Sequence, residues 1–380
     1  MPRRLVTAAL FVAAVTITAP AQSSPITRID HPPQLTPLGF SIGGRVLPVA
    51  NSDPRFGGVD YTYQWPGIYF EAAFSGTEVY FATGKGDEIL HVTVDHQPPV
   101  PLVKPAPGVY QISGLGAGQH SVRIQVVTES QDAPDTFGGF ALSAIGNPLD
   151  PPRRLRQIEF IGDSHTVGYG NTSDTRTCST DVVWSTTDTS QAFGPLIAQH
   201  YGADYQINAI SGRGIVRNYN GFAADPIPIA YSWILFDKKQ NYRDSHWQPQ
   251  VIVIALGTND FSTSLNPGEK WKTRDALHAD YETTYLRFLE SLRAANPRAF
   301  FLLWATDTAN GEVEREEQKV IEQWRARGEK RVAFLPVDGL QLSACNWHPS
   351  LDDDRLIADR LEKSIDGVPG IWNRSGFAAP

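Results

Sequence analysis

The first part of the chain alternates apolar and polar positions with a period of two. Val122, Ile124 and Val126 alternate with polar neighbours, so one face of a strand can be buried while the other meets water. Gly-rich segments at 84–87 and 114–118 supply turns that need positive φ. The pattern predicts further strands at 68–74, 77–83, 89–95 and 140–144. Because no useful helical pattern interrupts them, residues 30–147 are predicted to form a small antiparallel β-sandwich.

The second part of the chain alternates strand and helix patterns. The Pro-rich segment 147–152 breaks the first pattern and is interpreted as a linker. Strands are predicted at 157–161, 205–210, 251–256, 300–305 and 332–337, several of them apolar throughout, as in strands buried on both faces. Helices are predicted at 190–200, 278–295, 312–327 and 351–365, and the polar segment 173–190 is expected to be a long loop. Residues 153–380 therefore predict a three-layer α/β/α domain with a parallel sheet.

The last predicted helix carries its own start signal. Ser350 stands at the N-cap position, and Asp353 follows at the spacing of a capping box.

The N-terminus has the layout of a secretory signal peptide. Arg3 and Arg4 precede an apolar run at 5–17, and Ala19-Pro20-Ala21 forms a small-residue cleavage pattern before Gln22. The apolar run is shorter than the roughly 20 residues that span a bilayer. We therefore expect residues 1–21 to be a signal peptide and the protein to be secreted and extracellular, with an uncleaved interfacial anchor as the alternative.

Composition and charge narrow the range of partners. The 380-residue chain has the hydrophobic and charged content of an ordinary globular protein and is long enough for two domains. Its formal net charge is −8, and removal of residues 1–21 takes away two Arg and no acid, which leaves −10. Nucleic acids and anionic membranes are therefore not expected as partners, whereas a neutral polymer fits. The chain is expected to be a monomer.

The cysteine content allows one intramolecular pairing. Cys178 and Cys345 are the two cysteines of the chain, and in an exported protein a disulfide between them is favoured over two free thiols. Two thiols do not make a structural zinc site, and no nearby His pair has ligand spacing. No metal and no cofactor are expected.

Four short motifs supply the parts of an acyl-transfer site. They are Gly162-Asp163-Ser164, Ser211-Gly212-Arg213-Gly214, Gly257-Thr258-Asn259-Asp260 and His348-Pro349. The first three follow predicted strands, and parallel sheets place ligands at the carboxyl ends of their strands. Ser164 is the candidate nucleophile and His348 the candidate base. The candidate oxyanion donors are the backbone N–H groups of Ser164 and Gly212 and the side-chain amide of Asn259.

The order of these motifs resembles the SGNH (GDSL-type) hydrolase superfamily. More narrowly, the run from Phe160 to Asn171, together with Ser211-Gly212-Arg213-Gly214-Ile215 and a preceding β domain, is similar to carbohydrate esterase family 2. This resemblance covers nearly the whole mature chain. It implies a jelly-roll-like N-terminal domain and the removal of O-acetyl groups from plant polysaccharides such as xylan or glucomannan.

The acid of a catalytic triad is missing from its expected position. In many SGNH enzymes it stands three residues before the His, which here is Cys345, and in many members of the narrower family two before, which here is Asn346. The Asn346 side chain could accept the ring proton of His348, as could a backbone carbonyl. We therefore predict a Ser-His dyad with neutral support, with Asp338 and the run 352–354 as reserve carboxylates.

Other residues near these motifs have open roles. His165 is the rival base, but adjacent side chains usually diverge, so His348 is favoured. Asp163 is expected to hold the turn. Trp347 and Trp304 are candidates for an aromatic platform under a sugar ring, although core packing is the commoner fate of a Trp.

Three functions remain open from the sequence. The leading hypothesis is a secreted, metal-independent carbohydrate O-acetylesterase acting on an acetylated polysaccharide or oligosaccharide through an acyl-enzyme. The alternatives are an SGNH lipase or thioesterase and a non-catalytic polysaccharide-binding protein with a disabled hydrolase. Activity should rise with pH through the titration of His348 near about 6.5.

Overall fold

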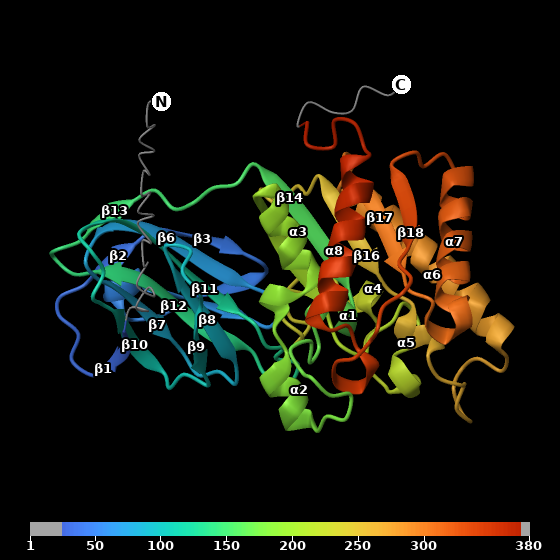
Figure 1. Ribbon diagram of the computed structural model, residues 1–380, viewed down its shortest axis with the longest axis horizontal. Coiled ribbons are helices and arrows are strands. Elements are labelled where there is room, and N and C mark those ends of the chain that lie inside the picture. Colours follow the sequence, from blue (N-terminus) through green and yellow to red (C-terminus); the bar gives the residue numbers. More distant parts are fainter. Residues whose placement is uncertain (1–24, 374–380) are drawn as a thin grey trace, which may run out of the picture.

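A computed structural model describes residues 25–373, which form two domains (Figure 1). The first is a sandwich of two antiparallel sheets. One sheet has the strand order β1-β10-β7-β12-β5-β4, with β2 paired to β12, and the other has the order β13-β6-β11-β8-β9, with β3 paired to β6. The strands are β1 (Ile26–Ile29), β2 (Thr36–Leu38), β3 (Phe40–Gly43), β4 (Val46–Ala50), β5 (Val59–Tyr63), β6 (Tyr69–Gly76), β7 (Val79–Thr83), β8 (Ile89–Val94), β9 (Val100–Val103), β10 (Gly108–Ile112), β11 (Gly118–Val126), β12 (Asp135–Leu142) and β13 (Asn147–Leu149).

The predicted sandwich is confirmed, and its core lies between the two sheets. Val122 and Ile124 of β11 are buried, whereas the intervening Arg123 is more exposed, as the period-two pattern predicts. Phe70 from one sheet stacks on Phe137 from the other, with ring centroids 4.1 Å apart. Aromatic packing of this kind fills the space between the sheets.

The segment predicted as a linker is in part a strand. Residues 147–149 form β13, which pairs with β6 at the edge of its sheet. An edge strand tolerates Pro148 because one side of the strand needs no donor. The connection between the domains is therefore the segment 150–155, between β13 and β14.

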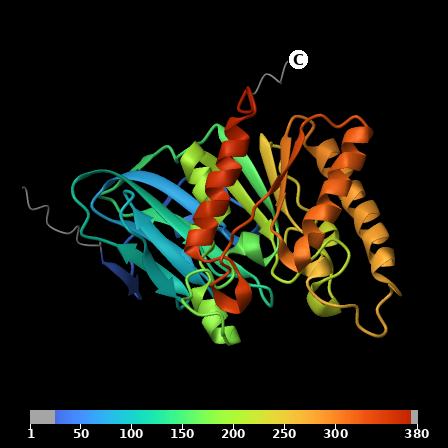
Figure 2. The ribbon, with the colours of Figure 1, turned by 45° about the vertical axis from the view of Figure 1, so that its right-hand side comes forward.

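The second domain is built on a parallel sheet with the strand order β15-β14-β16-β17-β18. In Figure 2, helices α3 and α8 cover one face of this sheet, and α6 and α7 cover the other. This confirms the predicted three-layer α/β/α architecture. The strands are β14 (Arg156–Gly162), β15 (Ala203–Ala209), β16 (Val251–Ala255), β17 (Phe300–Ala305) and β18 (Val332–Pro336). The helices are α1 (Ser164–Val167), α2 (Thr180–Thr186), α3 (Phe193–Tyr201), α4 (Ile227–Ala230), α5 (Thr258–Phe261), α6 (Arg274–Ala295), α7 (Thr308–Ala326) and α8 (Leu351–Asp366).

Local signals account for two helix starts. The capping box predicted for α8 is present, because Ser350 accepts from the Asp353 backbone and the Asp353 side chain accepts from the Ser350 backbone. The expectation of a loop throughout 173–190 is wrong, since α2 lies within it. The Ser179 side chain caps α2, and Val183 packs inward from it.

The predicted signal peptide lies outside the described residues. Among residues 25–373, no helix is both long enough and apolar enough to cross a bilayer.

Candidate active site

The turn between β14 and α1 presents Ser164 at the carboxyl edge of the sheet. Gly162 is required here, since a Cβ atom at this position would lie 2.0 Å from Thr166 Oγ1. The buried Asp163 side chain accepts from the His165 backbone N–H at 3.1 Å and so caps α1, as expected for a residue that holds the turn. Ser164 itself is 6% exposed.

The loop between β18 and α8 brings His348 against Ser164. His348 Nε2 lies 2.8 Å from Ser164 Oγ. His348 Nδ1 faces the backbone carbonyls of Cys345 and Asn346, at 2.9 Å and 3.1 Å. A proton on Nδ1 satisfies these carbonyls and leaves Nε2 to accept the serine proton. The structure thus joins the predicted nucleophile and base, which are 184 residues apart.

Of the two supports left open for His348, the structure shows backbone carbonyls and not the Asn346 side chain. Asn346 adopts a left-handed backbone conformation with φ of 51°, and its amide donates to Tyr169 Oη at 3.2 Å. Its backbone carbonyl faces the imidazole instead. The support of His348 is therefore neutral, as predicted, but comes from two main-chain oxygens.

The reserve carboxylates are engaged elsewhere among the described residues. Asp353 completes the cap of α8. The Asp354 side chain accepts from Asn171 Nδ2 and from the Phe193 backbone N–H at 3.0 Å and 3.1 Å. Asp352 pairs with Arg355 on the surface, and Asp338 interacts with Glu314. Within residues 25–373, His348 has no carboxylate partner.

Burial controls the titration of both histidines in the site. It lowers the pKa of His348 to about 4, although the two backbone carbonyls oppose this shift. Burial, and then the neighbouring His348, lower the pKa of His165 to about 3. The His165 ring meets the His348 ring edge-on, with centroids 5.5 Å apart. Both imidazoles are neutral at pH 7, and it is His348 that contacts Ser164 Oγ.

Two backbone donors stand unpaired in the site. Within the part of the chain that the structure describes, neither the Ser164 nor the Gly212 backbone N–H donates to another protein group. Gly212 has φ of 80°, a conformation that favours glycine. Unpaired donors beside a nucleophile suit a developing oxyanion.

The third predicted oxyanion donor, the side-chain amide of Asn259, makes hydrogen bonds within the protein. Asn259 Nδ2 donates to Asp163 Oδ2 at 3.0 Å and to the Arg213 carbonyl at 2.9 Å. The amide therefore links three of the four motifs, and its part in an oxyanion hole stays a prediction. Burial raises the pKa of its partner Asp163 to about 7.

Asp260 is a structural residue of the site for which the sequence alone predicted no role. Its carboxylate accepts from the backbone N–H groups of Ile215, Val216 and Arg217, each at 2.9 Å. Burial raises its pKa to about 6. Asp260 shapes the loop after Gly212, and the signal that could have revealed it was its place directly after Asn259.

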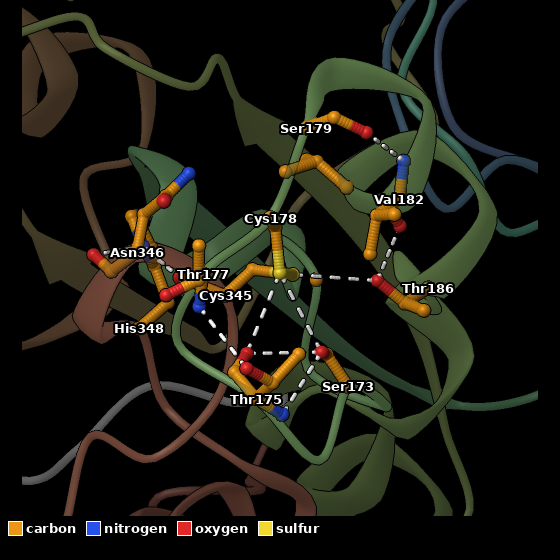
Figure 3. The surroundings of a disulfide bond; sticks show 12 residues. Ser173, Thr175, Thr177, Cys178, Ser179, Val182, Thr186, Cys345, Asn346 and His348 are labelled. Carbon is orange, nitrogen blue, oxygen red and sulfur yellow. Dashed lines mark hydrogen bonds between the residues drawn. A yellow bond between two sulfur atoms is a disulfide. The ribbon is translucent and has the colours of Figure 1, made fainter.

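A disulfide joins Cys178 to Cys345 beside the base (Figure 3). It ties the loop before α2 to the loop that carries His348. The Asn346 backbone N–H also donates to the Arg176 carbonyl at 2.8 Å. Gly170 makes room for the bridge, since a Cβ atom there would lie 2.5 Å from Cys345 Cβ.

The two candidate platform residues differ in position. Trp304 is 1% exposed and packs edge-on against Phe193 of α3, with centroids 5.2 Å apart, so the platform prediction is wrong for it. Its side chain points into a covered face of the sheet. Trp347 is 62% exposed beside His348, 6.0 Å from the Arg176 guanidinium. A sugar-binding role for Trp347 stays a prediction.

In residues 25–373, no group of three or more His, Cys, Asp or Glu side chains is arranged to hold a metal ion.

Comparisons with known proteins agree on one family. Residues 49–152 match the family model for the carbohydrate esterase 2 N-terminal domain, and residues 160–362 match the GDSL-like lipase/acylhydrolase family. The chain is 46% identical over 337 residues to an acetylxylan esterase/glucomannan deacetylase from Cellvibrio japonicus, covering 88% of this chain and 93% of that protein.

Solved structures give the same result. One is a carbohydrate esterase whose active site is described as having divergent catalytic and non-catalytic binding functions. It has 45% sequence identity and a TM-score of 0.83, over 89% of this chain and all of that one (100%). A family two carbohydrate esterase from Clostridium thermocellum in complex with cellohexaose has 27% identity and a TM-score of 0.75, over 88% of this chain and 100% of that one. The chain therefore belongs to carbohydrate esterase family 2 and is a serine carboxylic-ester hydrolase.

Proposed function

We propose that this esterase removes O-acetyl groups from plant polysaccharides such as xylan or glucomannan through an acetyl-enzyme on Ser164. The observation that carries the proposal is the 2.8 Å contact between Ser164 Oγ and His348 Nε2, next to two unpaired backbone donors. The Cellvibrio japonicus relative bears the name acetylxylan esterase/glucomannan deacetylase, which supports this substrate class.

The geometry supports a two-step reaction. Ser164 Oγ attacks the acetyl carbonyl while His348 Nε2 takes its proton. The N–H groups of Ser164 and Gly212 stabilise the tetrahedral oxyanion, and one such donor contributes roughly 3 kcal/mol to lowering the barrier. His348 then returns the proton to the departing sugar oxygen. Water, deprotonated by His348, then attacks the acetyl-enzyme. The bond from the acetyl carbon to Ser164 Oγ breaks, acetate is released, and His348 returns the proton to Oγ.

The backbone carbonyls replace the carboxylate of a triad in one respect. They fix the tautomer and direction of the imidazole, but they bring no negative charge to stabilise the imidazolium. Burial, without a carboxylate to offset it, keeps His348 neutral at pH 7, so Nε2 can accept the serine proton.

Acetate release from acetylated glucomannan and from an aryl acetate tests this proposal. Wild type should hydrolyse both, whereas Ser164→Ala and His348→Ala should lose about 10³-fold or more in kcat. Unchanged hydrolysis by Ser164→Ala would refute the assignment. Binding of glucomannan without any acetate release by wild type would favour the non-catalytic polysaccharide-binding alternative.

We also propose that the protein is secreted after removal of residues 1–21. The tripartite N-terminal pattern supports this. N-terminal sequencing of protein from the culture medium should begin at Gln22. A full-length protein that stays with the cells and is absent from the medium would contradict the proposal.

A further inference from the structure

One loop of the sandwich domain reaches the catalytic loop that contains Gly212. It comprises residues 127–134 and connects β11 to β12. The loop is docked on the α/β/α domain, since Thr189 donates to the Val127 carbonyl from its backbone N–H at 2.9 Å and from Oγ1 at 3.1 Å. Side chains from this loop are therefore fixed relative to the active site.

Two side chains of this loop, Glu129 and Gln131, form hydrogen bonds with the backbone of Ser211, the residue before Gly212. Glu129 Oε1 accepts from the Ser211 backbone N–H at 2.7 Å. Gln131 Nε2 donates to the Ser211 carbonyl at 3.3 Å. Glu129 is mostly buried and Ser211 is 8% exposed, so the first bond is shielded from water. A short bond that is shielded from water holds the backbone firmly.

The hydrogen bonds to the Ser211 backbone fix the direction of the Gly212 N–H. The Ser211 carbonyl and the Gly212 N–H belong to the same planar peptide unit, in which they point in opposite directions. Gln131, which holds the carbonyl oxygen, therefore aims the N–H directly. Glu129 holds the N–H of the preceding peptide unit and so fixes the backbone at Ser211 from which the Gly212 unit extends. Beyond this unit, the Gly212 carbonyl accepts from the Tyr219 backbone N–H at 2.9 Å.

Glycine at this position makes an external restraint important. Gly212 has no Cβ and sits at positive φ, so its own backbone preference is weak. We propose that Glu129 and Gln131 of the sandwich domain are positioning residues for the oxyanion donor at Gly212. The inference rests on the proposed function, and it gives the sandwich domain a part in the esterase reaction without substrate contact.

Steady-state kinetics with an aryl acetate and with acetylated glucomannan tests the proposal. Glu129→Ala removes the acceptor and should lower kcat about tenfold to a hundredfold while KM changes less than about threefold, because the oxyanion forms in the transition state. Glu129→Gln keeps an acceptor oxygen and should restore kcat to within about threefold of wild type. Gln131→Ala, at an exposed residue with a longer bond, should lower kcat by about threefold.

A matched control removes a different bond between the domains. Tyr69 Oη donates to Asp204 Oδ1 at 2.8 Å, and Tyr69→Phe should leave kcat unchanged. The inference is overturned if Glu129→Ala keeps the wild-type kcat, if its loss lies in KM, or if Tyr69→Phe loses as much. If Glu129→Ala does not fold, the other two variants still test the inference. A loss of activity in Glu129→Gln would overturn it, and so would an unchanged kcat in Gln131→Ala. Ser164→Ala separates the two claims, since activity in that variant would instead refute the proposed function.

Discussion

At the scale of single residues, the site departs from a Ser-His-Asp triad in how the histidine is supported. The Cys345 and Asn346 carbonyls hold His348 Nδ1, and the Asn346 side chain turns away toward Tyr169. The predicted rise of activity near about 6.5 is that of an unperturbed histidine, and it does not fit this site. Burial without a carboxylate partner lowers the pKa of His348 to about 4 instead.

The pH dependence of kcat/KM follows from this shift. His348 acts as a base only when neutral, so kcat/KM for an aryl acetate should rise with pH, reach half its maximum near pH 4 and stay level from about pH 6 to 8. A rise centred between pH 6 and 7 would contradict the neutral support.

Asn346→Gly is the matched variant for this prediction. It keeps the backbone carbonyl and suits the left-handed backbone at this position. We expect its kcat and its pH profile to stay within about threefold of wild type, because the side chain does not touch the imidazole. A loss approaching about 10⁴-fold, as when a triad carboxylate is replaced by its amide, would show that the side chain orients His348.

At the scale of elements, loops at the carboxyl ends of the strands carry the chemistry, and they are tied to one another. Asp260 holds the loop after Gly212, and Asn259 joins that loop to the turn of Ser164. The Cys178–Cys345 disulfide joins the loop before α2 to the loop of His348. Because Cys345 also supplies a carbonyl to the imidazole, the bridge restrains the base itself.

Removal of the disulfide should therefore affect both stability and rate. The bridge closes a separation of 167 residues, and loss of such a bridge costs about 2–5 kcal/mol of unfolding free energy. We expect Cys178→Ala/Cys345→Ala to unfold at a lower Tm and to show a severalfold lower kcat. Melting curves and kinetics with and without a thiol reductant check this.

The double variant also serves as the control. Reductant should lower the Tm and kcat of wild type and leave the variant unchanged. Equal activity of wild type with and without the bridge, verified by thiol titration, would show that it does not restrain His348.

At the scale of the whole molecule, the sandwich and the α/β/α domain share polar contacts that include buried charge. Arg45 of the sandwich is 1% exposed and lies 3.7 Å from Glu159 of β14. Its guanidinium is within 4.9 Å of the ring centroids of Trp65, Tyr231 and Tyr242. Removal of the Arg45 side chain should lower the free energy of unfolding, because Glu159 would stay buried without its cation.

Arg45→Ala should lower the free energy of unfolding by about 3 kcal/mol, measured by denaturant titration. Arg28→Ala is the control, since Arg28 pairs with Asp30 on the surface and should change stability by less than about 1 kcal/mol. Equal effects of the two substitutions would show that Arg45 does not brace the interface between the domains.

Sequence pattern predicted the two domains and the central strands because burial sets their periodicity. It also placed Ser164 and His348 at one edge of a sheet. It did not predict that Trp304 faces a covered side of the sheet, because a strand buried on both faces has no polar face to reveal direction. The direction of the Asn346 side chain depends on a left-handed backbone conformation. The contact between Glu129 and Ser211 depends on how the two domains dock. One sequence shows neither.

Phosphorylation of the enzyme by a dialkyl aryl phosphate tests the central claim most directly. Such an ester transfers its phosphoryl group to an activated serine, and the adduct is stable enough for peptide mapping. The account predicts one label per chain, on Ser164, with a matching loss of acetate release, and no label in Ser164→Ala. Full esterase activity in chains labelled at Ser164, or complete inactivation with the label on another residue, would contradict it.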